Sequence, residues 1–146
     1  MNEAINKALK TMKKGHGGPF GCVIKDETGK VIAVSSNTVL KDNDPTAHAE
    51  INAIKKACKK LKTYDLKNCT LYTTSYPCPM CLSAIIWANI KNVYYGTTKE
   101  DVEKIGFRDN YIYEYINGKK NIDLNLNQIS HKECLDLLDK YKNTIY

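Results

Sequence analysis

The chain has 146 residues, of which 42% are apolar and 26% are charged, and its formal net charge at pH 7 is +6. This size and composition are typical of one ordinary globular domain, which we expect to occupy residues 1–146. No apolar run approaches the roughly 20 residues needed to cross a bilayer, and the N-terminus lacks the layout of a signal peptide. These features argue against a membrane or secreted protein, and we expect a cytoplasmic one.

The positive charge comes almost entirely from lysine, because Arg108 is the only arginine. A basic surface can indicate a nucleic-acid partner. Arginine, however, is the residue favoured for bidentate contacts with phosphate and guanine. We therefore interpret the lysines as solvated surface residues and regard nucleic-acid binding as unlikely.

The predicted elements follow one another without repeats or linkers. Apolar spacing and turn residues predict helices over residues 2–14, 47–61, 99–105 and 131–143, a helix that begins near Pro79, and strands over 20–25, 30–35, 70–74 and 92–96. The first two strands should form a β-hairpin. In the helix over 47–61, we expect a buried stripe of Ile51, Ile54, Ala57 and Cys58. The order of elements predicts an α/β fold, a three-layer α/β/α sandwich with a mixed central sheet.

Two short motifs stand where helices are predicted to begin. The first is His48-x-Glu50. The second is Cys78-x-x-Cys81, which Pro77 directly precedes. One imidazole and two thiolates can hold Zn²⁺ and leave its fourth position open, which is typical of a catalytic site. Glu50 would then be available to carry protons. Residues two apart on a regular helix do not share a face, so His48 and Glu50 must use the irregular start of the helix.

The other four cysteines, Cys22, Cys58, Cys69 and Cys134, lie in apolar patterns and are predicted to be small buried residues. Either motif alone would be weak evidence, because Cys78-x-x-Cys81 could also be a redox pair or half of a structural zinc site. A purely structural zinc in an interaction domain is the non-enzymatic alternative. Glu50 argues against that alternative, since a structural zinc has no use for a proton carrier.

Almost the whole chain resembles the cytidine-deaminase-like superfamily and, within it, the bacterial-type guanine deaminases. The motif His-x-Glu followed by Pro-Cys-x-x-Cys is the signature of zinc-dependent nucleobase deaminases. The resemblance rests on residues 17–21, 43–50, 77–81, 84–88, 106–113 and Tyr146. It implies hydrolytic deamination of guanine to xanthine and ammonia.

The resemblance also implies roles for individual residues. His48, Cys78 and Cys81 would bind zinc, Glu50 would be the main proton shuttle, and Asp109, which is expected in a polar loop, would be a second shuttle. The groups that contact the base would be Asn37, the backbone of Ala49, Phe20, Trp87 and Tyr146. The family exchanges its C-terminal segment, here about residues 131–146, between two subunits, so a homodimer is implied.

Two other substrates stay open. A tRNA adenosine deaminase shares residues 44–50, and a deaminase of another free base such as cytosine would use the same zinc chemistry. The chain departs from the family pattern at two positions: Tyr76 stands where glutamate is usual, and Arg108 stands where another acidic residue can occur.

Overall fold

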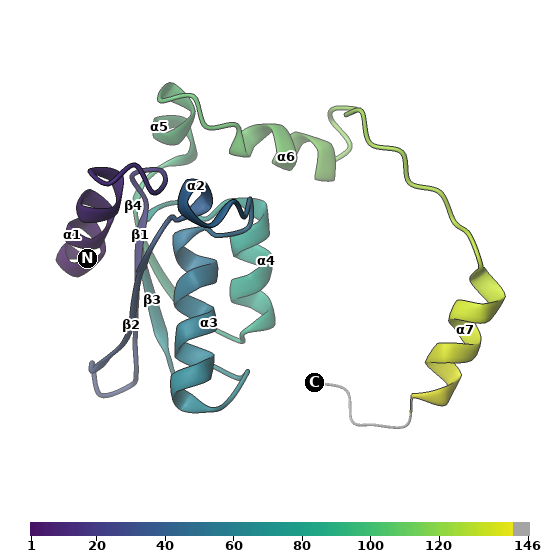
Figure 1. Cartoon of the computed structure of the whole chain (residues 1–146), viewed down its shortest axis with the longest axis horizontal. Coiled ribbons are helices and arrows are strands. Elements are labelled where there is room, and N and C mark those ends of the chain that lie inside the picture. The colour runs from purple at the N-terminus through teal and green to yellow at the C-terminus, as the bar shows by residue number, and fades with distance from the viewer. Residues whose placement is uncertain (142–146) are drawn as a thin grey trace.

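The computed structural model describes residues 1–141 as a mixed sheet with helices on both faces and a C-terminal extension (Figure 1). The elements, in chain order, are α1 (Asn2–Met12), β1 (Gly21–Lys25), β2 (Val31–Ser36), α2 (Val39–Asp42), α3 (Ala49–Leu61), β3 (Thr70–Ser75), α4 (Pro79–Trp87), β4 (Asn92–Thr97), α5 (Lys99–Lys104), α6 (Asp109–Ile116) and α7 (His131–Lys140). None of the helices in residues 1–141 has the length and apolarity that crossing a membrane requires.

Within the described residues, the sheet has four strands in the order β2-β1-β3-β4. Strand β1 pairs antiparallel with both β2 and β3, and it forms the predicted hairpin with β2. Strand β3 pairs parallel with β4, because α4 carries the chain from the end of one strand back to the start of the other. Parallel pairing places the C-terminal ends of β3 and β4 at the same edge of the sheet. The prediction of a mixed sheet is therefore confirmed.

Helix α1 covers one face of the sheet, and a glycine lets it approach closely. A Cβ atom at Gly21 would collide with the backbone oxygen of Ala4. Ala4, Ala8 and Thr11 are buried on the side of α1 that packs against β1 and β2. The small residues on both surfaces thus set the distance between this helix and the sheet.

Helices α3 and α4 cover the opposite face and enclose the main core (Figure 1). The buried stripe of α3 consists of alanines, Ala49, Ala53 and Ala57, together with Glu50. Ile51, Ile54 and Cys58 are only partly buried. The expected stripe is therefore confirmed for Ala57 and in part for Ile54 and Cys58, which pack against the core, while alanines make up most of the fully buried positions.

The short helix α2 was not predicted. The C-terminal part of the chain departs further from the sequence prediction, because Asp109 begins helix α6 instead of lying in a loop. Figure 1 shows α7 beyond a long extended segment, away from the sheet. Its leucines are exposed, and so is Cys134, which was predicted to be buried.

Candidate metal centre

The first motif lies at the start of α3. His48 is the N-cap residue with an extended backbone, φ −70° and ψ 158°, while Glu50 belongs to the first helical turn. Because His48 is not itself helical, the spacing of two places both side chains on the same side of the helix start. The geometric conflict between this spacing and a regular helix is resolved in this way.

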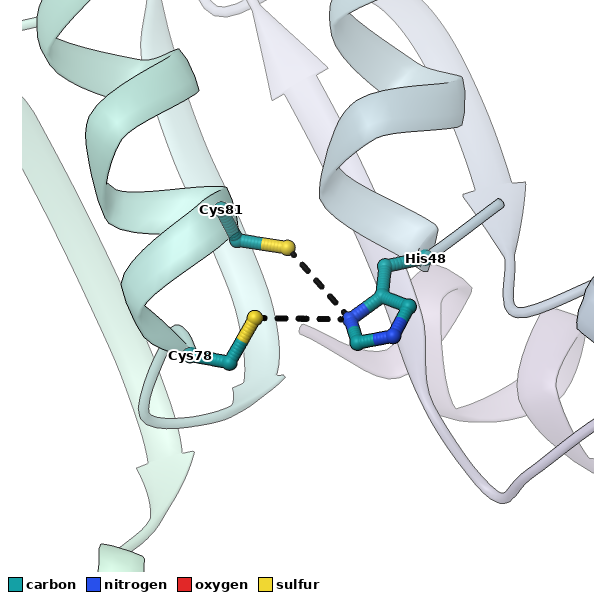
Figure 2. Close-up of side chains that lie close together, drawn as sticks. All are labelled: His48, Cys78 and Cys81. Carbon is teal, nitrogen blue, oxygen red and sulfur yellow. Dashed lines mark hydrogen bonds between the residues drawn. The ribbon is translucent and has the colours of Figure 1, made fainter. Parts of the chain in front are cut away.

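The second motif lies at the start of α4, which runs beside α3. Cys78 is the N-cap, and Pro79 occupies the first turn, where its missing N–H costs no hydrogen bond. Figure 2 shows the two sulfur atoms pointing toward the ring of His48. The Nδ1 atom of His48 lies 3.5 Å from Sγ of Cys78 and 3.6 Å from Sγ of Cys81.

These separations fit a zinc site. Nitrogen and sulfur ligands at ordinary zinc bond lengths and a tetrahedral angle lie about 3.6 Å apart, and all three ligand atoms lie within 4.8 Å of one another. Among residues 1–141, His48, Cys78 and Cys81 form the one such group of potential metal ligands. In the described chain this group supplies three ligands and no fourth, which leaves the open coordination position that a catalytic zinc requires.

Glu50 is buried beside the three potential ligands. Its side chain is 6% exposed, and Oε1 accepts a hydrogen bond of 2.7 Å from the hydroxyl of Thr73 on β3. Its other oxygen, Oε2, accepts one of 3.4 Å from Sγ of Cys81. Burial raises the pKa of Glu50 above its ordinary value, with the Thr73 hydrogen bond opposing the shift. A carboxyl group whose pKa is raised toward neutrality is suited to accept and return a proton.

The contact between Cys78 and His48 favours the negative thiolate form of Cys78 and the positive form of His48. A hydrogen bond from Cys81, assisted by His48, lowers the pKa of Cys78 to about 4. The hydrogen bond with Cys78 in turn raises the pKa of His48. Cys78 is therefore held as the thiolate, which is the form that binds a metal.

A narrow pocket opens at this group. Its lining residues are Phe20, Asn37, His48, Glu50, Ser75, Tyr76, Cys78, Phe107 and Asp109. The free space is about 30 Å³, enough for one or two water molecules. Phe107 packs edge-on against Phe20, with ring centroids 4.8 Å apart. Phe107 is the more exposed of the two rings.

The pocket brings together most of the residues expected from the sequence. Asn37 is buried, and its Oδ1 accepts hydrogen bonds from the backbone N–H groups of Gly18 and Val39, each at 3.2 Å. Asn37 is also one of the residues that line the pocket. The N–H group of Ala49 lies in the first turn of α3, where backbone donors have no partner within the helix.

Of the groups expected to contact the base, Ala49 and Trp87 are not among the described residues that line the pocket. The side chain of Trp87 is 72% exposed, and it lines a separate groove between α3 and α4. In the described chain Trp87 does not line the pocket, and its contact with the base stays a prediction. Its position near the end of α4 directs it away from the ligand residues at the start of that helix. Tyr146 lies outside the described residues.

Sequence reasoning did not assign Ser75, Tyr76 and Phe107 to the pocket. Ser75 ends β3, and Tyr76 follows it directly before the second motif. The closeness of Ser75 and Tyr76 to Cys78 in the sequence could have indicated their place in the pocket. Tyr76 thus lines the pocket itself, whereas Arg108, the other departure from the family pattern, is exposed at the N-cap of α6.

A further hydrogen bond joins α6 to the second motif. The hydroxyl of Tyr113 donates to the backbone oxygen of Pro77 at 2.8 Å. The Nζ atom of Lys99 lies 4.6 Å from the ring centre of Tyr113 and 5.0 Å from that of Tyr76. These contacts fix the helix that carries Asp109 against the segment that carries Cys78.

The fold and the ligand geometry define a zinc-binding deaminase domain, and a family comparison agrees. Residues 1–97 match the family described as the cytidine and deoxycytidylate deaminase zinc-binding region. The chain belongs to this family.

Comparison with individual proteins gives similar relatives. The chain is 48% identical over 116 residues to a guanine deaminase of Bacillus subtilis, covering 80% of this chain and 74% of that protein. The X-ray structure of guanine deaminase from Bacillus subtilis superposes with a TM-score of 0.87 at 40% identity, covering 99% of this chain and 94% of the other. A tRNA-specific adenosine deaminase of Buchnera aphidicola is 37% identical over 123 residues, which cover 84% of this chain and 79% of that protein.

Proposed function

We propose that the protein is a zinc-dependent aminohydrolase that converts guanine and water to xanthine and ammonia. The observation that carries this proposal is the buried carboxyl group of Glu50 beside His48, Cys78 and Cys81 at the end of a pocket. Guanine is chosen as the substrate because of the similarity to guanine deaminase over nearly the full chain.

His48, Cys78 and Cys81 would hold the zinc ion, which supplies a Lewis acid that activates water at neutral pH. Glu50 would take the proton released from that water and deliver it to the nitrogen that leaves C2 of the base. The hydrogen bond from Thr73 fixes the orientation of the carboxyl group for both transfers. One new C–O bond forms and one C–N bond breaks; of the two protons of water, one ends on ammonia and the other on N3 of xanthine.

Four groups would hold the base. The side-chain amide of Asn37 and the backbone N–H of Ala49 would donate hydrogen bonds, and Phe20 would contact the ring face. Asp109 lines the same pocket as Glu50 and would accept a hydrogen bond from the exocyclic amine. A carboxylate at that position would favour a base that presents donors on that edge.

The test is ammonia release by zinc-loaded protein offered guanine, adenine, cytosine and a tRNA anticodon stem-loop. We expect release from guanine, and its loss in the Glu50→Ala variant. Release from the RNA alone would contradict the proposal and identify a tRNA adenosine deaminase. Release from cytosine alone would likewise identify a different free base as the substrate.

We also propose that the protein is a homodimer in which the segment of about residues 131–146 is exchanged between subunits. In the described chain, α7 exposes Leu135, Leu137 and Leu138 by 45%, 69% and 68%. Exposed leucines on one amphipathic helix favour a partner surface. Tyr146, which would help to close the pocket, follows this helix in the chain.

Light scattering should give twice the mass of the chain, and a Leu137→Lys/Leu138→Lys variant should give the mass of a monomer. Lys132→Gln on the same helix serves as the matched control and should stay dimeric. A monomeric wild-type protein at micromolar concentration would contradict this part of the proposal. A cytoplasmic location remains a prediction, which cell fractionation would test.

A further inference from the structure

A second, larger cavity lies apart from the metal centre. It has a volume of about 670 Å³ and is bounded by α1, the end of β2, α2 and α3. Its lining residues are Lys7, Lys10, Thr11, Lys13, Lys14, His16, Ser36, Thr38, Lys41, Asp42, Asn52 and Lys56. We call this cavity the basic groove, because six of these residues are lysines and, among the described lining residues, Asp42 is the only acid.

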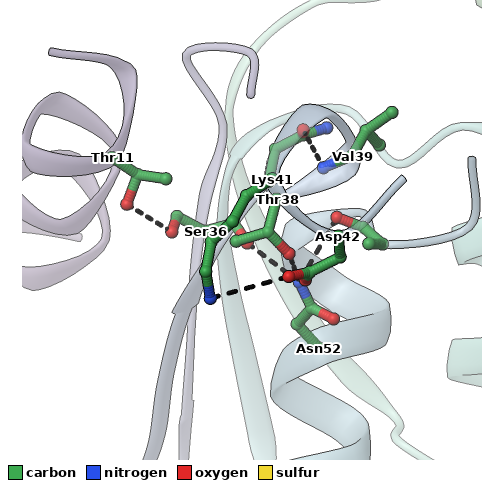
Figure 3. A network of polar contacts seen from close by, with 9 residues as sticks. Thr11, Ser36, Thr38, Val39, Lys41, Asp42 and Asn52 are labelled. Carbon is green, nitrogen blue, oxygen red and sulfur yellow. Dashed lines mark hydrogen bonds and ion pairs between the residues drawn. The ribbon is translucent and has the colours of Figure 1, made fainter. Parts of the chain in front are cut away.

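The floor of the basic groove is a preformed polar network (Figure 3). The hydroxyls of Thr11 and Ser36 share a buried hydrogen bond of 2.7 Å. The side-chain nitrogen of Asn52 donates to the backbone oxygen of Ser36 at 3.0 Å and to the hydroxyl of Thr38 at 2.9 Å. Since these bonds join α1, β2 and α3, the floor has a fixed shape before any ligand arrives.

The lysines reach the groove from three separate helices. Lys7 lies on α1, Lys41 on α2 and Lys56 on α3. Partial burial lowers the pKa of Lys56, and the nearby charges of Lys7 and Lys41 lower it further. Asp42 offsets part of this charge through its ion pair of 3.5 Å with Lys41. The remaining ammonium groups repel one another, and a bound anion would relieve that repulsion.

The shape and chemistry of the basic groove select a class of ligand. Its volume is in the range of small-molecule sites, and lysine is a common point-charge ligand of phosphate. No Phe, Tyr or Trp is among the described residues that line it, so His16 supplies the only ring there and the lysines dominate the lining. A bounded concavity also suits a short anion better than a long nucleic-acid backbone.

We propose that the basic groove binds a short linear polyphosphate, either free or as the phosphate chain of a nucleoside triphosphate. The lysines of α1, α2 and α3 would surround the phosphate groups, above the polar floor formed by Thr11, Ser36 and Thr38. Binding of an anion in the basic groove does not depend on which substrate the metal centre takes.

The test is calorimetric titration of zinc-loaded protein with inorganic tripolyphosphate, with ATP and with adenosine. We expect saturable binding of tripolyphosphate and ATP that weakens as salt rises, and no binding of adenosine. The groove variant Lys7→Gln/Lys41→Gln should weaken both interactions by about tenfold or more, because it removes two charges that converge on the ligand.

The matched control is Lys59→Gln/Lys91→Gln, which removes the same total charge from exposed positions outside the groove. This control should change affinity by less than about twofold, because exposed distant charges are screened. Equal affinity for tripolyphosphate and ATP supports the proposal and shows that the phosphate chain suffices. Tighter binding of ATP, with the same loss in the groove variant, supports it and identifies a nucleotide as the source.

Three results would overturn the proposal. The first is the absence of saturable binding of tripolyphosphate at millimolar concentration. The second is an equal loss of affinity in the groove and control variants, which would indicate a diffuse charge effect. The third is binding of the tRNA stem-loop without binding of tripolyphosphate, which would make the groove part of an RNA surface.

Discussion

Glu50 is the residue on which the proposed chemistry depends most. It is a buried carboxyl group whose two oxygens each accept one hydrogen bond, from Thr73 and from Cys81. Its raised pKa, caused by burial, suits a group that must both accept and release a proton during one turnover.

We therefore expect Glu50→Gln to reduce kcat by about 10²–10⁴-fold, the range typical of a lost general acid–base. Glutamine has nearly the same shape and can still accept the Thr73 hydrogen bond, so the fold and the zinc content should be kept. Steady-state kinetics and metal analysis of the same sample would check both. A variant that loses zinc in proportion to its activity would show that Glu50 is structural.

Asp109 should make opposite contributions to stability and to activity. Its pKa is raised by burial first and then by the charge of Cys78, while His48 opposes the shift. A carboxyl group with a raised pKa binds more protons in the folded state than in the unfolded state. The stability of the fold therefore decreases as pH rises from the ordinary aspartate pKa through the raised value.

We expect Asp109→Asn to be more stable than the wild type at pH 7 and less active toward the substrate. The stability difference should shrink as pH falls below the ordinary aspartate pKa, since the wild-type group is then neutral in both states. Urea unfolding at pH 7 and at about pH 3.5 would measure it. A destabilised variant at pH 7 would show that the charge of Asp109 is stabilised locally.

At the residue scale, the two motifs were sufficient to find His48, Glu50, Cys78 and Cys81, because zinc chemistry restricts both residue type and spacing. Ser75, Tyr76 and Phe107 have no such restriction, and their place in the pocket depends on how β3 and the segment before α6 fold. Trp87 lies outside the pocket of the described chain, because apolar residues in a motif-bearing helix can point to any side of it.

At the scale of elements, the contact between α1 and the sheet depends on glycine. The backbone oxygen of Ala4 occupies the space that a Cβ at Gly21 would need. Gly21→Ala must therefore push α1 outward from β1. Such overpacking typically costs about 1–3 kcal/mol of unfolding free energy.

Gly29→Ala provides the comparison for this prediction. Gly29 has a φ of +84°, but no atom lies within 4 Å of the position that a Cβ would take, so alanine there meets only backbone strain. Strain of that kind costs roughly 1 kcal/mol. Chemical denaturation of the two variants should show the larger loss for Gly21→Ala, and equal losses would mean that α1 adjusts freely.

The elements that sequence patterns predicted well are those with clear apolar spacing, which include α1, α3, the hairpin and β3. Helices α2 and α6 were missed for different reasons. Helix α2 has only four residues, too few for a periodic pattern, and α6 begins directly after Gly106, Phe107 and Arg108, a segment whose glycine is typical of a loop. The stripe of α3 was predicted only in part, because periodicity does not reveal how closely a helix approaches its sheet.

At the scale of the whole molecule, the metal centre joins the two helices that cover one face of the sheet. His48 belongs to the start of α3, and Cys78 and Cys81 belong to the start of α4. In the folded protein the three ligand atoms lie within 4.8 Å of one another, whereas the unfolded chain separates His48 from Cys78 by thirty residues. Zinc should therefore bind the folded state far more tightly than the unfolded state.

Removal of zinc by a chelator should thus lower the melting temperature. Free zinc at about 100 times its dissociation constant stabilises the folded state by about 2.7 kcal/mol, which corresponds to a shift of roughly 6–10 °C for a domain of this size. Cys81→Ser should abolish most of this shift, because it removes one of the three ligands. Glu50→Gln should retain it, because Glu50 is proposed to move protons and not to bind the metal. Equal melting temperatures for the wild type with zinc and after chelation would show that α3 and α4 are held together by their apolar contacts alone, and the zinc ligands would then serve the chemistry only.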